Sequence, residues 1–122
     1  MAVKLVLNGG IKSCCSVTPT EVVARSLREW LPDSVELIVI DRARDEWRPD
    51  SLAIVASMVY QDDIFPLVYI DDTLAMIGGI PKRNTLIAML KREIEYGISK
   101  DDILDVARRR IEAEMDAEVA LA

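Results

Sequence analysis

Two adjacent cysteines, Cys14 and Cys15, are the residues of this 122-residue chain best suited to nucleophilic chemistry or metal binding. They are the only cysteines in the sequence. A thiolate attacks disulfides and also binds soft metal ions. The chain contains no histidine. This excludes a histidine general base, a Ser-His-Asp triad, a Cys-His pair and a histidine-containing metal site. The chemistry predicted from these residue types is thiol–disulfide exchange or the binding of a soft ion.

The composition is that of one globular domain. Hydrophobic residues make up 51% of the chain, which is enough to bury a core, and the formal net charge is -6. That charge argues against a nucleic acid or an anionic membrane as the main partner. No apolar run reaches the ~18–20 residues that cross a bilayer, and residues 1–7 are not a secretion signal. We expect a cytoplasmic protein whose cysteines rest as thiols.

The apolar pattern predicts an α/β domain with the element order β-α-β-α-β-β-α, followed by an extra C-terminal helix. The expected strands are residues 3–7, 35–40, 67–70 and 73–77. The expected helices begin near residues 18, 50, 81 and 99. A βαβ unit followed by a hairpin gives a mixed four-stranded sheet with helices on both faces. We therefore divide the chain into a domain, residues 1–97, and a helical extension, residues 98–122.

Polar residues and glycines mark the expected helix ends. Thr18, with Glu21 three residues later, has the pattern of a capping box at the start of the first helix. Gly97 suits the left-handed position that ends the third helix. Ser99 with Asp102 can cap the fourth. The two cysteines are then expected in a loop, before the first helix.

Three features resemble the thioredoxin-like fold over about residues 3–96. Two thiols lie between the first strand and the first helix, Pro66 begins the third strand, and Gly78-Gly79 follows the hairpin. The resemblance implies a cis peptide bond before Pro66, beside the thiol site. It also implies that the backbone there offers a docking edge to an extended thiol substrate.

Two narrower families share fragments of this sequence. A small family of thioredoxin-like disulfide oxidoreductases is similar at Cys15, Pro19-Thr20, Trp30-Leu31 and Gln61-Asp62-Asp63. The arsenical-resistance metallochaperone family, also described as a trans-acting repressor, is similar at Cys14-Cys15-Ser16, Pro66-Leu67 and Pro81-Lys82-Arg83. This chain lacks one cysteine expected from each resemblance. A redox Cys-x-x-Cys pair ending at Cys15 would need a cysteine at position 12, which is Lys12, and the arsenical family has a further cysteine where this chain has Thr20.

The leading hypothesis is thiol–disulfide exchange at Cys14 and Cys15, with Pro66 shaping the site and a protein or small-molecule thiol as partner. The chain would then be a thiol–disulfide oxidoreductase without a cofactor. Free N–H groups at a helix start, or the cations of Lys12 and Lys82-Arg83, would favour the thiolate. Neighbouring Cα atoms lie ~3.8 Å apart, whereas a disulfide usually needs ~4.4–6.8 Å, so exchange through one thiol is less restricted than an internal disulfide.

Two alternatives remain open. In the first, Cys14 and Cys15 bind As(III) or Sb(III), which favour three sulfurs, so that a second copy, a small thiol or a partner protein completes the site. In the second, both cysteines are inert loop residues. The protein would then be an interaction subunit, docking as a homodimer or in a larger complex through its C-terminal helix. The helix residues with apolar spacing are Ile103, Ala107, Ile111 and Met115.

Overall fold

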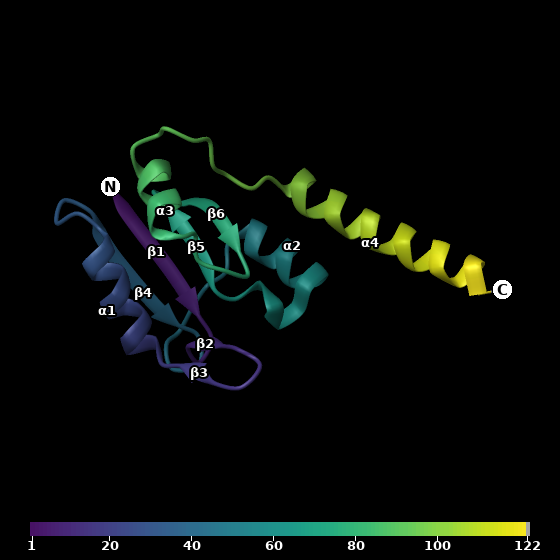
Figure 1. The fold of residues 1–122 in the computed structure, drawn as a ribbon, viewed down its shortest axis with the longest axis horizontal. Helices are drawn as coiled ribbons and strands as arrows, with labels where there is room; N and C mark the ends of the chain where they lie inside the picture. The colour runs from purple at the N-terminus through teal and green to yellow at the C-terminus, as the bar shows by residue number, and fades with distance from the viewer. Residues whose placement is uncertain (122) are drawn as a thin grey trace.

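The computed structural model describes residues 1–121 and has an α/β architecture built on a mixed four-stranded sheet (Figure 1). The strand order is β4-β1-β5-β6. These strands are β1 (Ala2–Leu7), β4 (Glu36–Asp41), β5 (Leu67–Ile70) and β6 (Thr73–Ile77). Strand β1 runs parallel to β4 and antiparallel to β5, and β5 pairs antiparallel with β6. The predicted sheet is therefore confirmed.

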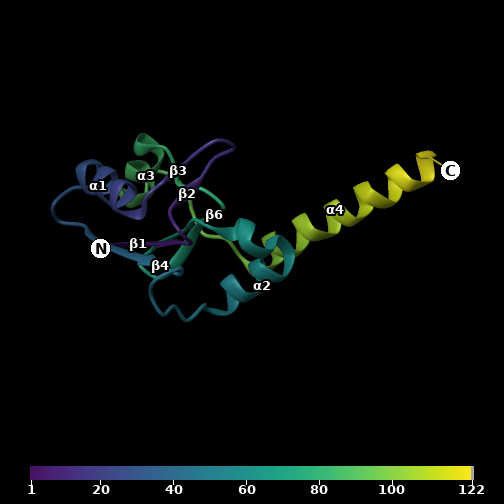
Figure 2. The ribbon, with the colours of Figure 1, turned by 90° about the horizontal axis from the view of Figure 1, so that it is seen from below.

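Helices cover both faces of this sheet, as the sequence predicted (Figure 2). The helices are α1 (Thr20–Trp30), α2 (Ser51–Tyr60), the 3-10 helix η1 (Gln61–Ile64), α3 (Arg83–Leu90) and α4 (Lys100–Leu121). Helices α1 and α3 pack on one face, and α2, η1 and the start of α4 pack on the other. Within the described residues, no helix has the length and apolar character that a membrane span requires.

The alternation of side chains along β1 explains the two cores. Val3, Leu5 and Leu7 join the core under α1 and α3, whereas Val6 joins the core under α2. Successive residues of a strand point to opposite faces of its sheet. Because both faces are covered, β1 needs apolar residues at almost every position. A nearly continuous apolar run of this kind is the pattern from which the sequence analysis predicted the strands.

The segment before α1 differs from the prediction. Instead of a loop, β2 (Ile11–Lys12) and β3 (Val17–Thr18) form a small antiparallel hairpin. Thr18 pairs with Ile11 in this hairpin, so it does not cap α1. Pro19 occupies the N-cap position without a side-chain hydrogen bond. The expected capping box at Thr18 is therefore wrong.

Helix α3 ends earlier than predicted, at Leu90. Arg92 adopts a left-handed φ of 59°, and two backbone hydrogen bonds close the turn, from Arg92 N to Met89 O and from Glu93 N to Ala88 O. This is the Schellman arrangement, which stops a helix by satisfying its last carbonyl groups. Gly97 has a φ of 123° but lies in the connection to α4, so its predicted role as the helix stop is wrong.

The predicted start of α4 is confirmed. The Asp102 carboxylate accepts a hydrogen bond from Ser99 N at 2.9 Å, and Asp102 N donates to Ser99 Oγ at 3.1 Å. The N–H and hydroxyl groups of Ser99 hold the pKa of Asp102 below its ordinary value. This reciprocal pair satisfies two backbone donors at the helix start.

Replacing Ser99 by alanine is expected to reduce stability by about 1 kcal/mol, the usual cost of a lost N-cap. Urea unfolding measures this loss, and faster amide exchange at Asp102 would locate it in the first turn of α4. Ser51→Ala is the matched control, because Asp50 already caps α2 by accepting from Ala53 N. Equal losses in the two variants would contradict the capping role of Ser99.

Candidate functional site

Cys14 and Cys15 form the tip of the β2–β3 hairpin, between Ser13 and Ser16. Ser13 N donates to Ser16 O at 2.8 Å, and the two serine hydroxyls lie 2.9 Å apart within hydrogen-bond distance. Both cysteines are free thiols and both are exposed. Their Sγ atoms are 3.4 Å apart. The turn therefore presents two neighbouring sulfurs to solvent on a hydrogen-bonded support.

The base of the same hairpin and Pro66 line one cavity of about 510 Å³. Its lining includes Gly10, Ile11 and Lys12 from the hairpin and Asp62, Asp63, Phe65 and Pro66 from the η1–β5 connection. The Phe65–Pro66 peptide bond is cis, as expected. The cysteines are not among the lining residues. The structure thus brings Lys12 and Pro66 to a common cavity and places the sulfurs beyond it, at the hairpin tip.

The backbone at Pro66 is engaged within the chain. Its carbonyl oxygen accepts hydrogen bonds from Gly78 N at 3.0 Å and Gly79 N at 3.2 Å. Proline has no N–H to donate. The Pro66 carbonyl oxygen therefore serves the turn after β6, and it is not free to take part in the expected docking edge.

The thiols do not sit at the start of α1. Strand β3 and Pro19 separate them from the first residue of the helix, Thr20, and the hairpin tip points away from α1 (Figures 1 and 2). The helix N–H groups thus give the sulfurs no support. Lys82 and Arg83 are exposed at the start of α3 and do not line the cavity. Among the cations considered from the sequence, Lys12 is the one placed on the thiol hairpin.

Asp41 positions the segment that leads into the thiol hairpin, and our sequence analysis did not identify it. It is only 3% exposed and ends β4. Its carboxylate accepts hydrogen bonds from Gly9 N at 2.9 Å, Thr20 Oγ1 at 2.8 Å, Ala43 N at 3.0 Å and Arg44 Nε at 3.1 Å. One buried side chain therefore ties the end of β4 to the chain entering the hairpin and to the start of α1.

The charge of Asp41 is maintained by these donors. Burial by itself raises the pKa of a carboxyl group, but the hydrogen bonds from Gly9, Thr20, Ala43 and Arg44 outweigh it and lower the pKa of Asp41 to about 2. A sequence signal for this role existed. Asp41 directly follows an apolar strand, and the carboxyl ends of parallel strands meet at one edge of a sheet. Asp41 is indeed the register partner of Leu7, the last residue of β1.

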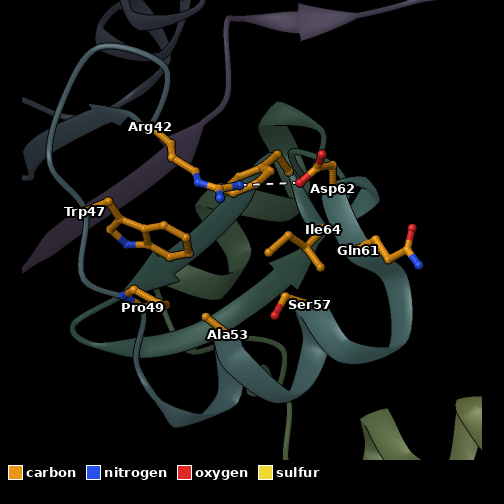
Figure 3. Close-up of a pocket in the computed structure, with 9 residues that line it drawn as sticks. Arg42, Trp47, Pro49, Ala53, Ser57, Gln61, Asp62 and Ile64 are labelled. Carbon is orange, nitrogen blue, oxygen red and sulfur yellow. Dashed lines mark hydrogen bonds and ion pairs between the residues drawn. The ribbon is translucent and has the colours of Figure 1, made fainter.

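A second cavity, of about 300 Å³, lies between the loop after β4, helix α2 and η1 (Figure 3). Trp47 and Phe65 meet edge to face with ring centroids 5.6 Å apart. The Arg42 guanidinium lies 5.5 Å from the Phe65 ring and pairs with Asp62 at 3.4 Å. Asp62 and Phe65 line both cavities, so the two flank the η1–β5 connection. No sequence pattern predicted this cavity, because it forms where the loop after β4 folds back against η1 and Phe65, all within residues 42–65.

The acidic residues of the chain do not extend the thiol pair into a larger ligand set. Within residues 1–116, whose side chains the structure describes, no group of three or more cysteine, aspartate or glutamate side chains is arranged to hold a metal ion. A soft ion at this site would thus have two protein sulfurs, those of Cys14 and Cys15, and would need further ligands from elsewhere.

Comparison with known proteins finds no matching family model, no matching curated protein and no matching solved structure. The architecture that the chain shows is an α/β fold with a mixed four-stranded sheet and an added β-hairpin. Its function must therefore be inferred from the thiol turn and the cavity beneath it.

Proposed function

We propose that this chain has a thioredoxin-like fold and carries out thiol–disulfide exchange through Cys14 and Cys15. Two features support the fold: β1 runs parallel to β4 in a sheet ordered β4-β1-β5-β6, and Pro66 directly precedes β5. The observation that carries the function is the exposed pair of sulfurs, 3.4 Å apart, on a hairpin whose base shares a cavity with Pro66.

The exchange proceeds through one cysteine at a time. The thiolate attacks one sulfur of a substrate disulfide, the substrate S–S bond breaks, and a mixed disulfide forms on the protein. The departing substrate sulfur leaves as a thiolate and takes a proton from water. A small-molecule thiol then attacks the substrate sulfur of the mixed disulfide, restores the protein thiol and forms a disulfide with the second half of the substrate. A second small-molecule thiol releases that half as a thiol, so the two electrons that reduce the substrate come from two thiols, which end as their own disulfide.

An internal Cys14–Cys15 disulfide is not part of this cycle. A disulfide bond is ~2.05 Å long and normally joins Cα atoms further apart than neighbouring residues can be. The two Sγ atoms lie 3.4 Å apart, which is a contact between thiols. The second cysteine instead remains available as an alternative nucleophile.

Single and double cysteine variants test this proposal. We expect Cys14→Ser or Cys15→Ser to retain exchange, at a rate reduced by less than about tenfold, and the double variant to lose it completely, because each thiol acts alone. Release of a coloured thiolate from an aromatic disulfide gives the rate, and intact-mass spectrometry detects the mixed disulfide. The urea-unfolded chain is the control, because it gives the exchange rate of the same two cysteines without the folded structure around them. If the folded chain reacts no faster than the unfolded chain, the proposal is wrong.

Binding of As(III) or Sb(III) is the second candidate, and the 3.4 Å separation of the sulfurs is the observation that favours it. Two thiolates on one soft ion with metal–sulfur bonds of ~2.3 Å lie at comparable separations. The same variants, titrated with a thiol reagent with and without arsenite, separate the candidates. Arsenite protection of both thiols without exchange activity would favour metalloid binding. If the chain shows neither arsenite protection nor exchange activity, the interaction subunit is favoured.

A further inference from the structure

The C-terminal helix α4 leaves an apolar stripe uncovered. Leu104 is 45%, Ile111 58% and Met115 60% exposed, and these residues lie on one face of the helix together with Ala107. Ile103, which the sequence placed on the same stripe, is instead 2% exposed and packs in the core beneath α2. The structure thus divides the predicted stripe between the domain and solvent.

The rest of the domain supports only the first half of α4. The Arg110 guanidinium lies 5.7 Å from the ring of Tyr60 in α2, and beyond this point the helix projects away from the sheet (Figures 1 and 2). Helices in proteins derive most of their stability from packing an apolar face. The projecting half of α4 has such a face, at Ile111 and Met115, and both of these side chains are more than half exposed.

We propose that a second copy of this chain covers the stripe from Ala107 to Met115, in an antiparallel α4–α4 pair with Ile111 on the twofold axis. In this arrangement Ile111 packs against its own equivalent, and Ala107 of each copy faces Met115 of the other. A small side chain opposite a long one allows the two helices to approach closely. The inference does not depend on the chemistry of the thiols.

The charges beside the stripe favour this partner and this orientation. Arg108 and Glu112 lie on one flank of the Ile111 stripe, and Arg110 and Glu114 lie on the other. In an antiparallel pair, equivalent flanks adjoin, so Arg108 of one copy lies near Glu112 of the second copy, and Arg110 lies near Glu114. A parallel pair would join opposite flanks and place Arg108 near Arg110 and Glu112 near Glu114. The surface is complementary to itself in the antiparallel orientation alone.

The Arg108 contact within its own copy is compatible with this pairing. Arg108 and Arg109 pair with Asp105 one turn earlier in the helix. A guanidinium has five N–H donors, so Arg108 can keep Asp105 and also meet a carboxylate from a second helix. The acidic residues Glu112, Glu114 and Asp116 on the projecting half disfavour a nucleic acid or an anionic membrane as the occupant of the stripe.

Sedimentation equilibrium of the full chain under reducing conditions tests the pair. We expect a dimer whose dissociation constant rises by about 100-fold or more in Ile111→Glu, because two carboxylates would meet at the centre of an apolar contact. Ile54→Glu is the matched control, since Ile54 is 47% exposed on α2 and lies outside the stripe. Circular dichroism checks that each variant folds. A wild-type chain that stays monomeric at 100 µM, or an Ile111→Glu variant that dimerises normally, would overturn the proposal.

The orientation is tested by Arg108→Glu. An antiparallel pair is weakened by the new repulsion from Glu112, whereas a parallel pair is strengthened by attraction to Arg110. Disulfide crosslinking gives a second measurement in the Cys14→Ser, Cys15→Ser background. Ile111→Cys should crosslink to itself readily, and Met115→Cys should not, because the axis separates the two copies of residue 115. Efficient crosslinking of Met115→Cys, or tighter association of Arg108→Glu, would exclude the antiparallel arrangement.

Discussion

Asp41→Asn is expected to lower the free energy of unfolding by about 2 kcal/mol at pH 7, because it replaces a buried, charged acceptor that four donors hold. Asparagine has nearly the same shape, so the change removes the charge and one acceptor atom without altering the packing. Its amide oxygen can still accept from Gly9 N and Ala43 N, but its NH₂ group cannot accept from Thr20 Oγ1 or Arg44, which now donate to Asp41 Oδ2. Urea unfolding monitored by tryptophan fluorescence measures the loss.

The effect should depend on pH with a defined sign. The pKa of Asp41 is about 2 in the folded chain, below its ordinary value of 3.8, so the unfolded chain binds the proton more readily between these values. The carboxylate therefore contributes its full stability above pH 4, and this contribution is lost as the pH falls from 4 toward 2. The gap between wild type and Asp41→Asn should shrink by about 2 kcal/mol over that interval.

Asp33→Asn, in the exposed turn after α1, is the control for removing an acidic charge. It should change stability by less than about 0.5 kcal/mol, as surface substitutions usually do. A wild-type chain whose advantage over Asp41→Asn stays constant down to pH 2 would show that the Asp41 carboxylate is not held by the donors described here.

Gly10→Ala is expected to disrupt the β2–β3 hairpin and to slow thiol exchange by about tenfold or more, since a ~1 Å displacement of a reactive group can cost that much. Gly10 has a left-handed φ of 84°, and a Cβ atom there would collide with the carbonyl oxygen of Thr18. The hairpin can relieve that collision only by separating β2 from β3. The exchange rate and the amide exchange of Lys12 and Thr18 would report the change.

Gly9→Ala is the control that distinguishes the effect of the steric collision at residue 10 from the effect of backbone strain. Gly9 has a similar φ of 75°, but a Cβ atom there would meet nothing within 4 Å. Both variants carry the strain of a left-handed alanine, about 1 kcal/mol. Only Gly10→Ala should open the hairpin. Equal effects of the two substitutions on thiol exchange would show that hairpin packing does not position the cysteines.

Elements with a strong local pattern were predictable. The strands from Leu67 to Ile70 and from Thr73 to Ile77 were found at their predicted bounds. The predicted Ser99–Asp102 pair before α4 was also found, because a cap is a contact between residues a few positions apart. The end of α3 was missed because Arg92, a residue without the conformational freedom of glycine, adopts the left-handed conformation.

The sequence by itself determined the mixed sheet and the pairing of its hairpin strands, and it indicated two adjacent thiols as the candidate reactive groups. These follow from side-chain types and from spacing along the chain. Only the tertiary structure decided that the thiols stand on a hairpin tip rather than at a helix start, that Asp41 anchors the hairpin's approach, and that Ile103 leaves the α4 stripe. The roles of Asp41 and Ile103 depend on contacts between residues far apart in the chain, such as Asp41 with Gly9. The thiol hairpin is local, but each of its strands has only two residues, which is too short for a recognisable alternating pattern.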